Sequence, residues 1–308
     1  MNSILTITMN PAVDLSAAVP NVFPGHKLRC GQPRSDPGGG GINVSRAIKR
    51  LGGESTAFHC SGGPTGHALC SLLDDEGIRH QPYTIANWTR QSWTVDETAS
   101  GQQYRFVLPG PWVSEKEWLG LLSAVRLVRP ALELVVASGS LPPGVPDDFY
   151  ARLAHLVNKC GGRLVLDTSG PPLVAAICEG VHLIKPSLRE LEALSGGRVV
   201  HPEHQAESAM EIVRRSKVEA AVVSLGAGGV LFATRDGVER MHAPSVKVRS
   251  CVGAGDCMIA GITLALSRGE ALRDCVRHGM ACGTAAVMNP GTELCHKCDV
   301  DHLLGQIK

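Results

Sequence analysis

Five nearly continuous apolar runs constrain the fold of this 308-residue chain more than any other feature. The runs are rich in β-branched residues and occupy residues 4–9, 133–137, 163–167, 181–185 and 219–225. Unbroken apolar runs of this length are typical of strands that are covered on both faces. Helical patterns lie between them, at residues 42–51, 66–76, 114–128, 147–159 and 203–216. The alternation predicts an α/β fold in which helices flank both faces of a parallel central sheet.

Two segments, at about residues 13–35 and 80–108, depart from this rhythm. Within them, residues 92–97 and 102–108 alternate between polar and apolar side chains, as half-exposed strands do. Ser100-Gly101 provides a turn signal between these two stretches. The two segments therefore predict a small β-sheet lid beside the main sheet.

The last part of the chain contains two helical stretches in succession, at residues 255–267 and 270–288. Neither an internal repeat nor a low-complexity linker divides the sequence. We therefore expect one domain over residues 1–308 that includes the lid segments.

The composition limits the kinds of partner this chain can have. Lys and Arg number 30 against 29 Asp and Glu, which gives a formal net charge of +1. Binding to nucleic acid or to an anionic membrane depends on excess positive charge, so neither partner is expected. No run approaches the ~18 apolar residues of a membrane span, and residues 1–14 lack the features of a signal peptide. Most of the eleven cysteines lie in apolar runs, which fits free thiols in a reducing cytoplasm.

The clearest chemical signal is the sequence CVGAGD at residues 251–256, which precedes an apolar helical run. Two glycines in three residues let the backbone amides of Gly253, Ala254 and Gly255 converge at a helix N-terminus, where an anion is favoured. An acidic residue at that position repels phosphate. The presence of Asp256 at this position makes sense if its carboxylate takes a proton from a hydroxyl that attacks the phosphate. The alternative is that Asp256 is an N-capping residue after a glycine turn.

Four consecutive glycines in PGGGGINV, at residues 37–44, form the second signal. Glycine weakens helices and strands, so a glycine run is not there for their stability. The run is explained if its backbone lies directly against a polar ligand, with Asn43 forming hydrogen bonds to the ligand's hydroxyls. A flexible loop before a helix is the alternative.

Other candidates follow predicted strands or lie in the predicted lid. Ligands bind open α/β sheets at the carboxyl ends of the strands, which is where NPAVD (residues 10–14), SGSLPPG (138–144) and KPSLRE (185–190) occur. The glycine turn SLGAGG at residues 224–229 is explained equally well as a hairpin turn. Arg90 and Arg105 in the lid could clamp a phosphate, or they could be solvated surface residues.

Several common motifs are missing from the sequence. It has no Walker loop, no G-x-G-x-x-G, no G-x-S-x-G and no H-E-x-x-H. Phosphate binding would therefore use the GAGD segment. The C-x-x-C at residues 295–298 lacks a second Cys/His pair at zinc-finger spacing, and His201 and His204 suggest a surface turn.

Taken together, these motifs resemble the PfkB (ribokinase-like) carbohydrate kinase family. NPAVD, GGGGINVSRA, SGSLPPG, KPSLRE, VVSLGAGG and VGAGD occur in this order across nearly the whole chain. The chain is most similar to the 6-phosphofructokinase branch of the family, through HKLRC at 26–30, WTRQ at 88–91, SGQQYRFVLPG at 100–110 and MNPGTELC at 288–295. The resemblance implies a ribokinase-like fold with a β-lid. It also implies Mg²⁺- and ATP-dependent phosphoryl transfer to a sugar hydroxyl, here the C1 hydroxyl of fructose 6-phosphate.

The resemblance also implies roles for individual residues. Asp256 would be the general base, and the amides of residues 253–255 would form the anion hole for the migrating phosphoryl group. A second set would hold the sugar phosphate: Asp14, Gly39, Gly40, Asn43, Ser140, Lys27, Arg90 and Arg105, with Arg29 supplied by a partner subunit. A third set would hold ATP: Lys185, Ser187, Glu190, Ser224, Gly226, Gly229, Cys251, Gly283 and Thr284. Glu190 would organise Mg²⁺ through water, and a monovalent cation such as K⁺ would bind backbone carbonyls at Ser250, Val252, Ala286, Asn289 and Gly291.

Three positions depart from the family pattern. Ser187 stands where the family's N-x-x-E motif has Asn, and it has a shorter reach and no amide donor for the metal network. Cys251 replaces the usual Thr before VGAGD and is a weaker hydrogen-bond partner. Gly40 occupies the slot where many 1-phosphofructokinases and tagatose-6-phosphate kinases have Lys, which favours fructose 6-phosphate as the substrate.

Two alternatives remain at this stage. One is a kinase of the same family that acts on tagatose 6-phosphate, fructose 1-phosphate or an unphosphorylated ketose. The other, motivated by Ser187 and Cys251, is a catalytically weak sugar-phosphate sensor. Exposed strand edges in a lid invite pairing, so we also expect a homodimer in which the lids of two subunits pack together.

Overall fold

The computed structural model describes residues 3–128, 132–197, 199 and 201–307, and its main element is a nine-stranded sheet. The strand order is β13-β12-β11-β10-β9-β8-β1-β4-β5. The bounds are β1 Ile4–Thr8, β4 Thr56–Ser61, β5 His80–Thr84, β8 Leu134–Ser138, β9 Arg163–Asp167, β10 Val181–Ile184, β11 Val218–Ser224, β12 Val230–Thr234 and β13 Gly237–Met241. All five predicted apolar runs are strands of this sheet.

The sheet is parallel from β11 to β5, and its other end is antiparallel. β12 and β13 are joined to β11 and to each other by short turns, one of which contains the 3₁₀ helix Gly226–Gly228. A short turn forces antiparallel pairing, whereas parallel strands need a long crossover. The glycine turn at residues 224–229 is therefore a strand–turn–strand connection as well as a candidate ligand loop.

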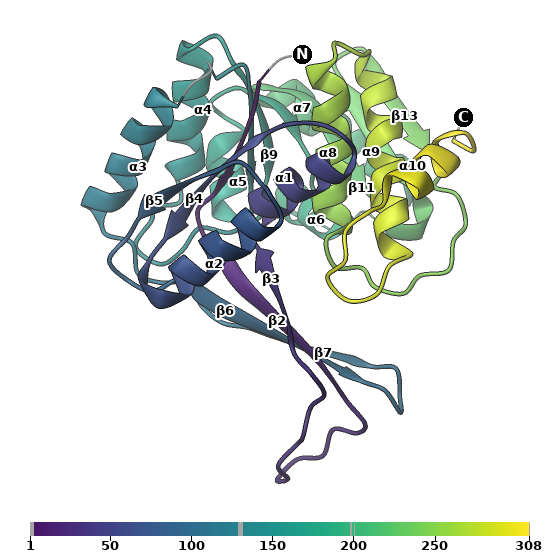
Figure 1. Ribbon diagram of the computed structural model, residues 1–308. Coiled ribbons are helices and arrows are strands. Elements are labelled where there is room, and N and C mark those ends of the chain that lie inside the picture. The colour runs from purple at the N-terminus through teal and green to yellow at the C-terminus, as the bar shows by residue number, and fades with distance from the viewer. Residues whose placement is uncertain (1–2, 129–131, 198, 200, 308) are drawn as a thin grey trace.

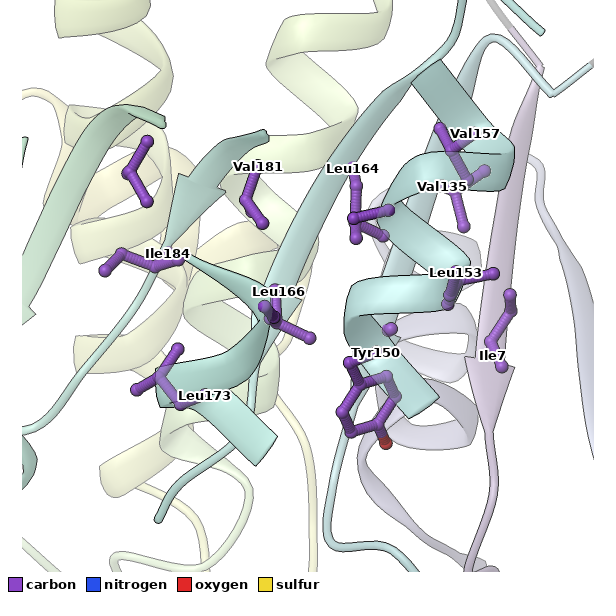
Figure 2. Close-up of a cluster of buried hydrophobic side chains, with 14 of the residues drawn as sticks. Ile7, Val135, Tyr150, Leu153, Val157, Leu164, Leu166, Leu173, Val181 and Ile184 are labelled. Atoms are coloured by element: carbon purple, nitrogen blue, oxygen red, sulfur yellow. The ribbon is translucent and has the colours of Figure 1, made fainter. Parts of the chain in front are cut away.

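Helices cover both faces of the sheet, as the unbroken apolar strands predict (Figure 1). Along β8, Val135 and Ala137 belong to one core and Leu134 and Val136 to the other. The first core is covered by α3 Glu115–Leu127, α4 Phe149–Lys159, α5 Pro171–Ala176, α6 Leu188–Ser195 and α7 Pro202–Arg215. The second is covered by α1 Gly40–Arg50, α8 Ala254–Ser267, α9 Leu272–Val287 and α10 Lys297–Leu304. Figure 2 shows the first core, with Tyr150 and Leu153 of α4 against Ile7 of β1.

The predicted lid is a separate four-stranded sheet in the order β3-β2-β6-β7. Its strands are β2 Ala12–Val19, β3 Arg34–Gly38, β6 Arg90–Glu97 and β7 Gln103–Val107. Figure 1 shows this sheet projecting away from the main body. The predicted lid boundary at residue 80 is wrong, because β5 pairs with β4 at the edge of the large sheet. The lid strands of that segment begin only at Arg90.

The bounds of the predicted helices agree with the structure to within a few residues. The sequence analysis missed short helices such as α5 and α6. The helices α5 and α6 have 6 and 8 residues, too few for a clear 3.6-residue period. The remaining helix, α2 Gly63–Asp75, packs with α1 over a third core that includes Leu69 and Leu73. Within the described ranges, none of the helices has both the length and the apolar character needed to cross a membrane.

Candidate active site

The N-terminus of α8 lies between two cavities. Gly253 has a left-handed φ of 74°, which a side chain would strain, and it leads the chain into α8. Ala254 and Gly255 line one cavity, while Gly253 and Asp256 line the other. The helix is capped by Gly253 rather than by Asp256, so the interpretation of Asp256 as an N-cap is wrong. Its carboxylate is instead directed into a cavity from the first turn of the helix.

Asp256 accepts hydrogen bonds from two other elements. Nδ2 of Asn43 on α1 donates to Oδ2 at 3.0 Å, and the Ser138 hydroxyl at the end of β8 donates to Oδ1 at 3.4 Å. Desolvation by the surrounding protein raises the pKa of Asp256 to about 7, and the nearby charge of Asp167 adds to this rise. The two hydrogen bonds and the charge of Lys185 oppose it. A carboxyl with this pKa is suited to exchange a proton near neutral pH.

A buried ion pair lies beneath the start of α8. Nζ of Lys185, at the end of β10, is 3.2 Å from Oδ1 of Asp167, at the end of β9, and the Lys185 side chain is only 7% exposed. Burial lowers the pKa of Lys185, but the charge and hydrogen bond of Asp167, together with the charges of Glu190 and Asp256, outweigh burial and raise it. A Cβ on Gly255 would stand 3.3 Å from the Lys185 Nζ, so the ammonium lies directly against the helix N-terminus.

The glycine run brings the backbone of α1 close to the large sheet. A Cβ on Gly41 would lie 2.6 Å from the carbonyl oxygen of Ile7, and one on Gly40 would overlap the Ser138 hydroxyl. Gly39 has φ 115° and lines the cavity that contains Asp256. The segment is the ordered end of β3 and start of α1, so the interpretation as a flexible loop is wrong. Gly40 packs on Ser138 and is not among the residues that line the cavity.

The cavity on the Asp256 side, about 250 Å³ in volume, is enclosed by the lid and by the starts of α1 and α8. Its polar lining includes Asp14, Gly39, Asn43, Arg90, Ser92, Thr94, Arg105, Gly253, Asp256 and Thr292. The guanidinium of Arg90 is held by backbone carbonyls, since it donates to Leu108 at 3.0 Å and to Asn10 at 3.1 Å. Its buried Nε has no hydrogen-bond partner within the described residues. The cavity thus has cations at the lid and a carboxylate at the helix.

Asp14 faces those cations across the cavity. Burial raises the pKa of Asp14 to about 6, and the positive charges of Arg90 and Arg46 oppose that rise. A Cβ on Gly38 would overlap the Asp14 carboxyl, so the first glycine of the run makes room for this side chain. Asp14 is therefore held in the cavity by its packing against β3.

Sequence reasoning missed a buried network behind Asn43. Arg46, one turn further along α1, is 2% exposed and bonds to Asp36 at 3.4 Å, to Glu76 at 2.5 Å and to Oδ1 of Asn43 at 3.3 Å. Thr292 donates to the other oxygen of Asp36 at 3.0 Å. The only sequence signal was the position of Asp36 directly before PGGGG. This network holds Asn43 in the orientation in which its amide reaches Asp256.

The second cavity, about 310 Å³ in volume, is mostly apolar. Six predicted nucleotide-binding residues line it together: Ser224, Gly226, Gly229, Cys251, Gly283 and Thr284. The sequence analysis missed the segment after β13, from which Ala243, Pro244 and Val246 also line the cavity. That segment is short and irregular, so it carried no periodic signal. Cys251 lies in the walls of both cavities, at the point where they meet.

Three other predicted nucleotide residues, Lys185, Ser187 and Glu190, lie outside that cavity. Ser187 caps α6, where its hydroxyl accepts the Glu190 N–H at 3.3 Å and the Glu190 carboxylate accepts the Ser187 N–H at 2.7 Å. This capping box accounts for the Ser-x-x-Glu spacing. Ser187 also forms an isolated parallel β-bridge with Ser224, which lines the second cavity. The start of α6 therefore lies beside that cavity.

The residues predicted to bind a monovalent cation lie on the loop before α8, on the last turn of α9 and on the loop that follows α9. The Ser250 hydroxyl donates to the carbonyl of Gly291 at 2.7 Å, and it accepts the Val252 N–H at 3.2 Å. Asn289 follows α9 and donates to the carbonyls of Ala285 and Leu294. Backbone carbonyls are the ligands that monovalent cations prefer, and here those of Ala286 and Gly291 accept hydrogen bonds from the Asn289 N–H and the Ser250 hydroxyl.

The structure does not bring Lys27 to the cavity of its own chain. Lys27 and Arg29 both lie in the exposed connection between β2 and β3, at the far end of the lid. Ser140 is outside the cavity as well, although it accepts a hydrogen bond from Asn10 at 3.1 Å. The other predicted sugar-binding residues, apart from Gly40, do line the cavity.

The family model of the pfkB family carbohydrate kinases matches residues 2–298. The chain belongs to this family. It is 46% identical over 298 residues to ATP-dependent 6-phosphofructokinase isozyme 2 of Mycobacterium tuberculosis, covering 97% of this chain and 88% of the relative. The structure of phosphofructokinase-2 from Escherichia coli in complex with potassium matches with a TM-score of 0.95 and 41% identity over 99% of each chain. The complex of that enzyme with fructose 6-phosphate matches with a TM-score of 0.94 and 39% identity, also over 99% of each chain.

More distant proteins match as well. A 1-phosphofructokinase of Xanthomonas campestris is 34% identical over 85% of this chain and 83% of its own length. The Arabidopsis thaliana ribokinase is 19% identical, and its TM-score of 0.77 over 98% of each chain shows the shared ribokinase-like fold.

Proposed function

We propose that this pfkB-family carbohydrate kinase transfers the γ-phosphoryl group of ATP to the C1 hydroxyl of fructose 6-phosphate. The observation that carries the proposal is the position of residues 253–256 between two cavities of different character. The apolar cavity suits a nucleotide base and ribose. The cavity with Arg90 and Arg105 suits a phosphorylated sugar, and Asp256 stands where the two substrates would meet.

Asp256 would act as the general base. Its pKa of about 7 leaves a large fraction of the carboxyl ionised at neutral pH and still basic enough to accept the proton of an alcohol. Asn43 and Ser138 fix the carboxylate by hydrogen bonds to its two oxygens. The proton would pass from the sugar hydroxyl to Asp256 as the hydroxyl oxygen bonds to phosphorus and the bond to ADP breaks.

The backbone at the start of α8 would stabilise the transferring phosphoryl group. The N–H groups of residues 253–255 are at a helix N-terminus, where unpaired donors and the helix dipole favour negative charge. Lys185 adds a buried positive charge directly beneath Gly255.

Two carboxylates near this point, Asp167 and Glu190, offer the hard oxygen atoms that Mg²⁺ prefers. Both carboxylates act electrostatically on Lys185, so they lie close to the same place. Glu190 keeps its carboxylate although Ser187 replaces the usual Asn, so this chain retains a donor set that fits the ion. Mg²⁺, when bound, would neutralise charge on the phosphate oxygens.

The lid cations favour a substrate that already carries a phosphate. Arg90 and Arg105 line the same cavity as Asp256, and Arg90 is held in place by two backbone carbonyls. Gly40, which takes the place of the Lys found in many 1-phosphofructokinases and tagatose-6-phosphate kinases, packs against Ser138 with no room for a side chain. The phosphate on C6 would therefore bind at the lid while C1 is presented to Asp256.

The test is the substitution Asp256→Asn, assayed with MgATP and fructose 6-phosphate. We expect kcat to fall by about 10²–10⁴-fold while calorimetry shows that the sugar phosphate still binds. The matched control is Asp236→Asn in the exposed β12–β13 turn, which should leave kcat unchanged. Near-normal turnover by Asp256→Asn would remove it from the role of base.

A panel of acceptors separates this proposal from its alternatives. We expect the highest kcat/KM with fructose 6-phosphate. A higher kcat/KM with tagatose 6-phosphate or fructose 1-phosphate would show that the chain is a kinase of the same family with that sugar as its substrate. Binding of these sugars without turnover would indicate a sensor.

We further propose that two copies of the chain associate through their lids. Phe106 on β7 is 56% exposed and pairs with Trp93 of β6, which is also exposed, so the lid presents uncovered apolar surface. Association through that surface would allow Lys27 and Arg29 to reach the cavity of the partner. Light scattering should give the mass of a dimer at micromolar concentration, and a monomeric mass would contradict the proposal.

Two further properties belong to the proposal. The facing loops at Ser250 and Gly291 would bind K⁺, and activity should rise when K⁺ replaces a bulky organic cation in the assay. The eleven cysteines are all free thiols, which supports a location in the reducing cytoplasm.

A further inference from the structure

Three side chains at the free edge of the large sheet bring their metal-binding atoms together. His59 on β4, His80 on β5 and Cys70 on α2 each offer one nitrogen or sulfur atom, and these atoms all lie within 4.8 Å of one another. His59 is fully buried, and the other two are partly exposed. Within the described residues, none of the three lines either cavity of the active site.

The hydrogen bonds of the two imidazoles leave one place for a cation. Nδ1 of His59 faces the carbonyl oxygen of Cys60 at 3.0 Å, and Nε2 of His80 faces the Asp74 carboxylate at 3.1 Å. Both of these partners can only accept, so both of these ring nitrogens must carry their hydrogen. Each neutral ring then has a lone pair on its other nitrogen. Those nitrogens, Nε2 of His59 and Nδ1 of His80, face each other at 3.1 Å.

Two lone pairs at this distance repel each other unless a positive centre lies between them. Tetrahedral Zn²⁺ holds two imidazole nitrogens at 2.0–2.1 Å, which places them about 3.3–3.4 Å apart. The observed separation of 3.1 Å is close to that value. The ring centroids are 5.3 Å apart, so the two nitrogens point almost straight at each other, and both rings would have to turn for a tetrahedral ion to bind them.

The helix α2 supplies both a third ligand and an outer partner. Cys70 and Asp74 are one turn apart, so their side chains lie on the same face of the helix. The Cys70 sulfur is 3.7 Å from the Ser61 hydroxyl at the end of β4, and Asp74 binds the outer nitrogen of His80. A carboxylate behind a ligating imidazole is the usual outer arrangement at zinc sites.

We propose that His59, His80 and Cys70 form a binding site for Zn²⁺ or a similar borderline-soft divalent ion, with water as the fourth ligand. The ligands come from β4, β5 and α2, which pack together at one end of the large sheet. A bound ion would therefore tie α2 to the sheet edge. This site is separate from the proposed kinase activity and does not depend on it.

The test uses the full-length protein, freed of metal and kept reduced with a phosphine. Competition with a chromophoric chelator should show one equivalent of Zn²⁺ bound, and Zn²⁺ should raise the thermal unfolding temperature. Co²⁺ in its place should give the visible bands of a tetrahedral site and a thiolate-to-metal charge-transfer band.

Three variants assign the ligands. Cys70→Ser should abolish the charge-transfer band, and His80→Gln should weaken Zn²⁺ binding by more than about 100-fold, whereas Asp74→Asn should weaken it by about 10–100-fold. The matched controls are Cys298→Ser and His204→Gln, which alter a cysteine and a histidine elsewhere. Retention of kcat shows that each variant is folded.

Three results would overturn the proposal. The first is the absence of stoichiometric binding, in which case a proton shared by the two imidazoles occupies the gap. The second is binding that Cys70→Ser leaves unchanged. The third is a cobalt band that disappears in the Cys298→Ser control.

Discussion

Asn43 donates its side-chain amide to Asp256 at 3.0 Å, which joins two segments 213 positions apart in the sequence. The contact connects the end of the glycine run on α1 to the first turn of α8. It links the cavity wall that would hold the sugar to the carboxylate that would accept its proton. The first prediction follows from the electrostatics of this bond.

The pH dependence of kcat should report the ionisation of Asp256. The base works only when ionised, and its pKa is about 7, so kcat should fall by about tenfold per unit as the pH drops below that value. The Asn43 hydrogen bond favours the ionised form, so Asn43→Ala should move the acid limb of the profile to higher pH. The matched control is Asn158→Ala on α4, whose side chain donates to the carbonyls of Glu179 and Gly180 and lines neither cavity. An unchanged limb in Asn43→Ala would show that another group sets the profile.

Gly40→Ala should damage both stability and activity. The added Cβ would overlap the Ser138 hydroxyl and stand 2.8 Å from its carbonyl carbon, so α1 must move away from β8. We expect a loss of about 1–3 kcal/mol in the free energy of unfolding, measured with urea. A drop in kcat should accompany it, because Asn43 moves with the helix. Gly237→Ala is the control, since no atom lies within 4 Å of its Cβ position, and it should be nearly neutral.

Arg46→Met should be strongly destabilising. It would leave the buried Asp36 with only the exposed Arg34 as a cationic partner, and it would remove the bond to Glu76 at 2.5 Å. Breaking a buried pair on one side costs about 3–5 kcal/mol, and urea unfolding would measure it. The exposed pair of Arg79 and Glu54, 3.8 Å apart, provides the control. Arg79→Met should change stability by no more than about 1 kcal/mol, and an equal effect of the two substitutions would contradict the role given to Arg46.

Arg90→Ala should weaken the binding of fructose 6-phosphate and leave the binding of ATP unchanged. Loss of a charged hydrogen-bond donor from the lid side of the cavity should raise KM for fructose 6-phosphate by roughly 10- to 100-fold. KM for ATP should stay within about twofold, because Arg90 lies outside the apolar cavity. Steady-state kinetics with each substrate varied in turn measures both values. A parallel rise in both would show that the lid arginine acts through the overall fold.

Cys251 should be the cysteine whose modification stops turnover. It is exposed and lies in the walls of both cavities, so a bulky maleimide on its sulfur would obstruct the path between the substrates. ATP should slow the inactivation, and Cys251→Ser should resist it. Four other exposed cysteines react without this consequence, namely Cys30, Cys160, Cys178 and Cys298. Inactivation of Cys251→Ser at the unmodified rate would place the sensitive thiol elsewhere.

The sequence by itself determined the five apolar strands, the longer helices between them and the glycine turn at the start of α8. Unbroken apolar strands require cover on both faces, and the glycines of residues 253–255 require a backbone turn, so local pattern was sufficient for both. The nucleotide residues came from the family resemblance and not from local pattern, and six of them line one cavity.

Only the tertiary structure decided which distant residues meet. The bond from Arg46 to Asp36, the Lys185–Asp167 ion pair and the facing imidazoles of His59 and His80 each depend on strand register and helix placement. Side chains recur with period 2 or 3.6 along their own element, and that period contains no information about the neighbouring element. Burial then sets the pKa of Asp256, because desolvation is a property of everything packed around the carboxyl.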